Sequence, residues 1–95
     1  MKLLWTAPAL RELEEIGDYI ARDNPSASSR VVSRVFDRVD ALADHPESGR
    51  SGRIPGTREL VITGTPFIVP YRIHNDRIEI LSIFHGARRW PESFD

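Results

Sequence analysis

The sequence contains no cysteine and only one lysine, Lys2, among its 95 residues. The absence of cysteine excludes disulfide bonds and zinc sites built from thiolates. His45, His74 and His85 are far apart and lack the spacing typical of metal ligands, so we expect neither a metal nor another cofactor. The apolar run that follows Lys2 has three residues, whereas a membrane span needs about 20. We therefore expect a soluble, cytoplasmic protein that has no contact with a membrane.

A strong surplus of positive charge is also absent, because the formal net charge is −1. Domains that hold RNA by its backbone are usually strongly basic. Five of the fourteen acidic residues lie in one segment, 12–23, which leaves room for a local basic site elsewhere. The charge balance therefore argues against extensive RNA binding without excluding a small basic surface.

The first 46 residues predict a strand followed by two helices. KLLW at 2–5 is short and apolar, as in a strand, and Thr6 is suited to cap the helix that follows. Apolar residues then recur at helical spacing up to Asn24-Pro25, which ends the first helix and begins the second. The second helix is expected to continue to about Ala43, before the His45-Pro46 dipeptide.

Three arginines in the second helix, Arg30, Arg34 and Arg38, recur at intervals of four residues. Residues at this spacing lie on one side of a helix. We interpret the row as a solvated face that forms ion pairs with Asp37 and Asp40.

The remaining sequence predicts three strands, at 58–62, 67–73 and 77–84, after a loop rich in glycine, serine and proline. The connecting segments are short enough for hairpins, so we expect an antiparallel meander. Pro70 has no N–H to donate, so the middle of its strand should face an edge or carry a bulge. Residues 1–95 are thus expected to form one α+β domain. It has two layers, in which an N-terminal strand and an antiparallel helix hairpin pack on a mostly antiparallel sheet (β-α-α-β-β-β).

Four segments in this order carry a resemblance to a known family: LADHPESGR at 42–50, TREL at 57–60, VPYRI at 69–73 and FHGARRW at 84–90. Together they resemble the RelE/ParE superfamily, the toxins of type II toxin–antitoxin modules. The resemblance implies neutralisation by a cognate antitoxin, whose flexible tail lies along the helices and sheet. It also implies that DNA is contacted only indirectly, through the antitoxin.

The resemblance implies two alternative mechanisms. RelE-like toxins cleave mRNA on the ribosome, and ParE-like toxins poison DNA gyrase. RNA cleavage without a metal needs an acid, a base and cations for the phosphate. His85 is a candidate acid or base, and Arg58, Arg72 and Arg88 are candidate phosphate ligands. Arg88 stands where the resemblance places an arginine after the last strand.

Two departures from the RNA-cleaving pattern favour the ParE-like reading. Ile68 stands where ribonuclease members tend to carry an arginine, and no lysine-bearing segment precedes the meander. Glu59 could act as a base, but its spacing fits a cross-strand partner equally well. We therefore expect gyrase poisoning in preference to enzymatic mRNA cleavage. A non-toxic protein-interaction module is a further alternative.

The segment FHGARRW also fits a recognition surface. In this interpretation His85 is structural, and the target contacts Arg89 and Trp90 together with Arg58, Arg72 and Arg88. Trp90 and Phe94 are expected to form an apolar lid over the sheet edge in preference to a platform for stacking bases.

Overall fold

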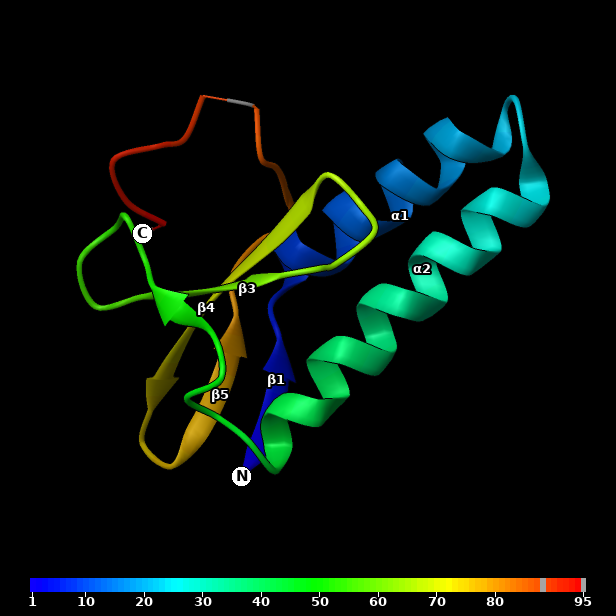
Figure 1. The fold of residues 1–95 in the computed structure, drawn as a ribbon. Coiled ribbons are helices and arrows are strands. Elements are labelled where there is room, and N and C mark those ends of the chain that lie inside the picture. Colours follow the sequence, from blue (N-terminus) through cyan, green and yellow to red (C-terminus); the bar gives the residue numbers. More distant parts are fainter. Residues whose placement is uncertain (88, 95) are drawn as a thin grey trace.

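The computed structural model describes residues 1–87 and 89–94, and Figure 1 shows their fold in two layers. A pair of antiparallel helices packs on one face of a six-stranded sheet. The strand order is β1-β5-β4-β3-β2, with β6 paired to β4; β1 is parallel to β5 and the other pairs are antiparallel. The elements are β1 (Lys2–Trp5), α1 (Ala7–Ala21), α2 (Pro25–Asp40), the 3₁₀ turn Ala41–Ala43, β2 (Arg50–Ser51), β3 (Arg58–Val61), β4 (Phe67–His74), β5 (Arg77–Ile80) and β6 (Phe84–His85).

The predicted fold class and its strand and helix order are therefore confirmed. The differences are local. Residues 41–43 tighten into a 3₁₀ turn, so α2 ends at Asp40 and not at about Ala43. The short strand β2 lies in a segment that was expected to be a loop, and the last predicted strand is divided into β5 and β6.

Both helices begin at the predicted caps. The hydroxyl of Thr6 accepts a hydrogen bond from the amide of Ala9 (3.4 Å), and the side chain of Asn24 accepts one from the amide of Ala27 (3.0 Å). These bonds satisfy amides that have no partner within the first turn of a helix. Neither helix has the length and hydropathy to cross a membrane, among the described residues.

The division of the last strand occurs opposite Pro70. Tyr71 pairs with Ile80 and Ile68 pairs with Phe84, so two residues of β4 face three residues of the partner segment, 81–83. The carbonyl of Pro70 accepts a hydrogen bond from the amide of Leu81 (3.0 Å), while proline itself donates none. The extra residue forms a bulge in the partner segment, whereas the sequence predicted an edge or a bulge in the strand of Pro70 itself.

The two faces of the sheet have different surroundings because successive side chains along a strand alternate. One face packs under the helices; its buried residues include Leu60, Val69, Tyr71, Ile78 and Ile80, in contact with Leu13, Val35 and Val39. The opposite face, which we call the open face, carries Glu59, Arg72 and Glu79 at the alternate positions.

The predicted pairing of the arginine row with Asp37 and Asp40 is wrong for the described residues, which contain no such ion pair. Asp40 follows Arg38 by two residues, a spacing at which side chains do not face each other on a helix. Arg34 instead reaches across to the turn between β3 and β4, where it donates to the carbonyl of Thr63 (3.2 Å).

Candidate functional site

The open face holds two carboxylates, each flanked by two arginines. Glu79 accepts hydrogen bonds from Arg72 (2.7 Å) and Arg77 (2.9 Å). The hydrogen bond from Arg72 is the main reason that the pKa of Glu79 lies below its ordinary value. Arg72 therefore lies on the open face, with Glu79 as its cross-strand neighbour.

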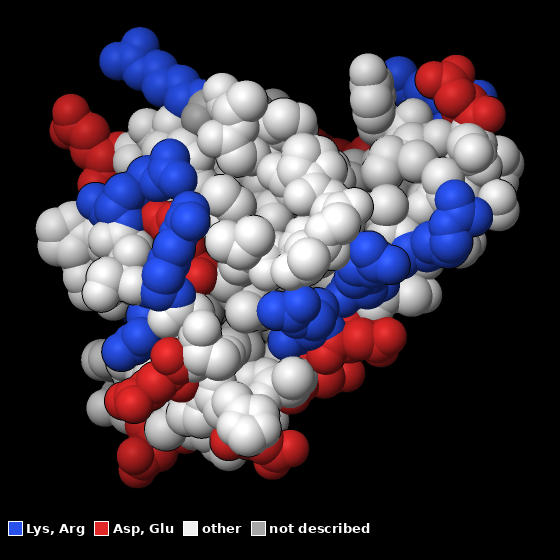
Figure 2. All heavy atoms as spheres, viewed as in Figure 1, with Lys and Arg blue, Asp and Glu red and all other residues white. Residues whose placement is uncertain are grey.

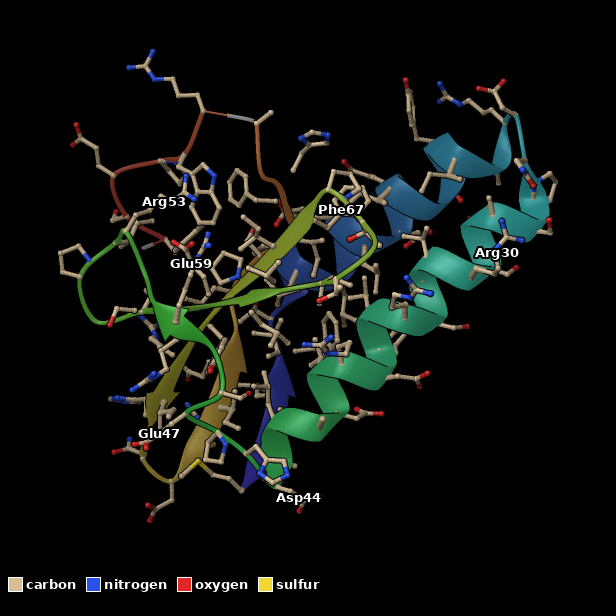
Figure 3. The ribbon with its side chains drawn as sticks, viewed as in Figure 1. Arg30, Asp44, Glu47, Arg53, Glu59 and Phe67 are labelled. Carbon is tan, nitrogen blue, oxygen red and sulfur yellow. The ribbon has the colours of Figure 1, made fainter. Side chains whose placement is uncertain are left out.

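Glu59 forms the second cluster, with residues of β2 and the loop after it. Its two carboxylate oxygens accept bonds from the Nη2 atom of Arg50 (3.0 Å) and from the backbone amide of Arg53 (2.8 Å), and Figure 3 labels Arg53 and Glu59. Burial alone would raise the pKa of Glu59, because its exposed fraction is only 2%. The hydrogen bonds from Arg53 and Arg50 outweigh burial, so the pKa lies below its ordinary value. Glu59 is thus a cross-strand partner of Arg50.

An aromatic cluster lies beside Arg53. Trp90 stacks on Phe84 of β6, with ring centroids 4.8 Å apart, and Phe94 contacts both rings. The guanidinium of Arg53 lies over the Trp90 ring at 3.8 Å from its centroid, a distance at which a cation is attracted to the ring face. The predicted apolar lid is present, and its cationic cover comes from a loop residue that sequence reasoning missed.

Arg58 and Tyr71 hold the loop that follows α2. The guanidinium of Arg58 donates to the carbonyl of Gly49 (2.8 Å). The hydroxyl of Tyr71 donates to the carbonyl of Pro46 (2.8 Å) and accepts from the amide of Gly49 (2.9 Å). A side chain at position 49 would lie within 2.6 Å of the Tyr71 ring, so only glycine fits there. Arg58 therefore supports the loop, and burial raises the pKa of Tyr71.

His85 lies on the other face of the sheet from Arg72. It pairs with Phe67 in register, their rings meet edge to face at 5.9 Å, and its Nδ1 atom accepts a bond from the amide of Ala87 (3.1 Å). His85 and Phe67 line a groove of about 740 Å³ against α1. The rest of the lining combines apolar and charged residues: Glu12, Glu15, Ile16, Asp18, Tyr19, Ile20, Arg22, Ile83 and Ala87.

The predicted site residues are therefore distributed over separate surfaces. Arg72 lies on the open face, Trp90 packs beside it, Arg58 supports a loop, and His85 lines the groove. Arg89 is exposed. Arg88 lies outside the described residues.

Sequence reasoning missed Arg50 and Arg53, which hold Glu59 and cover Trp90. The only signal available was the repeated Ser-Gly-Arg of 48–53, which was assigned to a loop. Nothing in that repeat indicates that its arginines meet a glutamate and a tryptophan from distant segments.

Comparison with known proteins places this architecture in a family. Residues 3–90 match the family model of the ParE toxin of the type II toxin–antitoxin system parDE. The protein Y4kP of Sinorhizobium fredii is 53% identical over 96% of this chain and 94% of its own length. Toxin RelE2 of Caulobacter vibrioides is 36% identical over 92% of this chain and 97% of its own.

A solved structure agrees with these sequence relationships. A chain of the chromosomal ParDE toxin–antitoxin system from P. aeruginosa superposes with a TM-score of 0.82 at 30% identity, covering 90% of this chain and 95% of that one. The chain therefore belongs to the ParE toxin family of type II toxin–antitoxin systems, within the RelE/ParE superfamily.

Proposed function

We propose that this toxin inhibits growth by poisoning DNA gyrase, and that a cognate antitoxin neutralises it by occupying the groove beside α1. The choice of gyrase as the target rests on one observation. The candidate acid, base and phosphate ligands that the structure describes do not lie together. Arg58 and Arg72 donate to partners within the protein, and Glu59 accepts from two arginines. An ionised carboxylate with a lowered pKa is a weak base.

The position of His85 adds to this argument. His85 lies opposite Phe67, whereas Arg58 lies opposite Tyr71, four residues further along β4. Four residues of a strand span about 13 Å. Arg72 is on the opposite face of the sheet. An acid or base and its phosphate ligands must converge within hydrogen-bond distance of one phosphate. The separation of His85 from Arg58 and Arg72 therefore supports recognition over cleavage.

The open face is better suited to recognition of a macromolecule. Arg50, Arg53, Arg72 and Arg77 are half-exposed there, and their guanidiniums outnumber the two carboxylates that they flank. Arginine and tryptophan are the side chains that most often dominate the binding energy of protein interfaces. The Arg53–Trp90 pair, with the exposed Arg89 nearby in sequence, supports a contact surface for gyrase.

The groove beside α1 supports binding of the antitoxin. Its apolar lining, which includes Ile16, Ile20 and Phe67, can bury aliphatic side chains of an extended or helical segment. Glu15 and Asp18 in its lining favour a lysine or arginine in that segment. A neutralising segment of this chemistry would cover His85 as well.

The target is tested by inducing the toxin without antitoxin. Poisoning of gyrase predicts filamentous growth arrest and DNA damage signalling while translation at first continues. Purified gyrase should also accumulate cleaved DNA in the presence of the toxin. Rapid loss of protein synthesis with codon-spaced cuts in transcripts would instead establish mRNA cleavage, and normal growth at confirmed expression would favour a non-toxic interaction module.

Two substitutions separate recognition from catalysis at the level of residues. Arg89→Ala removes an exposed cation that adjoins Trp90 in the sequence, which costs about 2 kcal/mol or more at a binding hot spot, so toxicity should fall. His85→Gln keeps a hydrogen-bonding side chain but loses proton transfer, which contributes about 10²–10⁴-fold to the rate of an enzyme. At matched expression and melting temperature, a loss of toxicity in His85→Gln alone would overturn the gyrase proposal.

A further inference from the structure

The arginine row of α2, Arg30, Arg34 and Arg38, forms a basic surface separate from the open face and the groove. The three residues recur every four positions, so the row is about 12 Å long at 1.5 Å per residue. Figure 2 shows basic side chains in a diagonal row along α2, with acidic side chains gathered below them. All three arginines are exposed.

Two of the three guanidiniums in this row donate hydrogen bonds to uncharged acceptors. Arg34 donates to the carbonyl of Thr63 (3.2 Å) and Arg30 donates to the hydroxyl of Ser26 (3.4 Å). Both acceptors are uncharged, and no ion pair involves the row within residues 1–87 and 89–94. The positive charge of the row is therefore available to an external anion.

Like charges four residues apart weaken an isolated helix, so the row is unfavourable for folding of α2 itself. A protein partner would need apolar surface to bury at the centre of its contact. Neither the groove beside α1 nor the hollow between α1 and α2 is lined by any of the three arginines. The row offers regularly spaced cations and little else, which suits a regularly spaced polyanion.

We propose that the arginine row binds the phosphate backbone of duplex DNA. A row of about 12 Å is comparable in length with a few consecutive phosphates of one DNA strand, so its three arginines can each contact one phosphate. A guanidinium can form two parallel hydrogen bonds with a phosphate. The contact carries no sequence information, because only the backbone is touched.

This assignment differs from the sequence-based expectation that DNA is reached only through the antitoxin, and it is independent of the growth target. Three phosphate contacts bind DNA weakly by themselves. Their effect is greatest where another protein already holds the DNA, because the second contact is then intramolecular. The acidic residues Glu12, Glu15 and Asp18 line the groove and repel DNA there, so the duplex approaches from the side of α2.

The salt dependence of DNA binding tests the proposal. Binding of the purified toxin to a short fluorescent duplex is measured by anisotropy over a range of salt concentrations. Three neutralised phosphates give a slope of about −2.7 in log K against log [salt], or a loss of affinity of about 40-fold between 50 and 200 mM. The variant Arg30→Ala/Arg34→Ala/Arg38→Ala should lose that slope almost completely.

Two further variants make the result specific. Lys2→Ala/Arg11→Ala/Arg22→Ala removes the same charge from other exposed positions and should retain most of the slope. Arg30→Ala/Arg38→Ala keeps the Arg34–Thr63 bond, and should lower the magnitude of the slope by about 1.8 without a change in melting temperature. Equal weakening in the control, no binding of DNA by the unmodified toxin at low salt, or preference for an acidic polypeptide over DNA would each overturn the proposal.

Discussion

The substitution Glu59→Gln should both destabilise the toxin and loosen the surface around Trp90. Glu59 accepts bonds from Arg50 on one oxygen and from the amide and side chain of Arg53 on the other. Glutamine keeps one acceptor but presents an N–H₂ group to the second set of donors, so one set loses its bonds. Hydrogen bonds to charged groups contribute about 1.5–3 kcal/mol. The arginine side chains are 55% and 43% exposed, so water screens part of that loss.

We expect a net decrease of about 2 kcal/mol in the free energy of unfolding, measured by urea denaturation. For a chain of this size this lowers the melting temperature by about 8–16 °C. Because Arg53 is released, Trp90 should become more exposed and its fluorescence should shift to longer wavelength. Trp5→Phe is introduced in every variant so that only Trp90 emits.

Glu79→Gln is the matched control, because it removes a carboxylate of the open face that has no contact with Arg53 or Trp90. It should leave the emission of Trp90 unchanged. Identical shifts in the two variants, or a loss of less than about 0.5 kcal/mol in Glu59→Gln, would refute the assignment of Glu59 as the support of this surface. Toxicity at matched expression should decrease in Glu59→Gln if the Arg53–Trp90 pair contacts the target.

Three further predictions concern stability. The pKa values of Glu59 and Glu79 are lower in the folded state than their ordinary value of 4.5, so the stability that these carboxylates contribute is present above that value and is lost as pH falls below it. Urea titrations below about pH 5 should show this loss of stability. The variant Glu59→Gln/Glu79→Gln should show a smaller loss. Tyr71→Phe removes two hydrogen bonds to the loop after α2 and should cost about 2–3 kcal/mol by urea denaturation, whereas an unchanged midpoint would show that water replaces the hydroxyl. Gly64→Ala places a side chain against Arg34 at a φ of +84° and should cost about 1–2 kcal/mol, with an effect below a few tenths contradicting the strain.

The sequence predicted the fold where the signal was local. Thr6 and Asn24 cap their helices by bonds to amides three residues away, a distance that the sequence displays directly. Pro70 predicted an irregularity at this point because a missing N–H is a property of the residue itself, although the bulge lies in the partner segment. The site was less predictable because its contacts join distant residues. Nothing local indicates that Arg53 covers Trp90, 37 positions further along the chain.

The error at the arginine row has the same origin. Charge spacing alone suggested that the row pairs with neighbouring aspartates, but the hydrogen bond from Arg34 ends on Thr63, which β3 brings close from another part of the chain. A competing acceptor of this kind cannot be read from the helix sequence. The sequence predicted that this surface is positively charged, but it did not predict which groups accept hydrogen bonds from its arginines.

The arrangement of the two faces limits how an antitoxin in the groove can act on the open face. His85 lines the groove, and the preceding residue, Phe84, carries the ring on which Trp90 stacks. Because successive strand residues alternate between faces, β6 is a direct covalent link between the two surfaces. An antitoxin segment bound only in the groove therefore leaves Arg72 and Glu79 uncovered. In the neutralisation proposed above, such a segment would affect the open face either by continuing around the edge of the sheet or by displacing β6 and, with it, the position of Trp90 under Arg53.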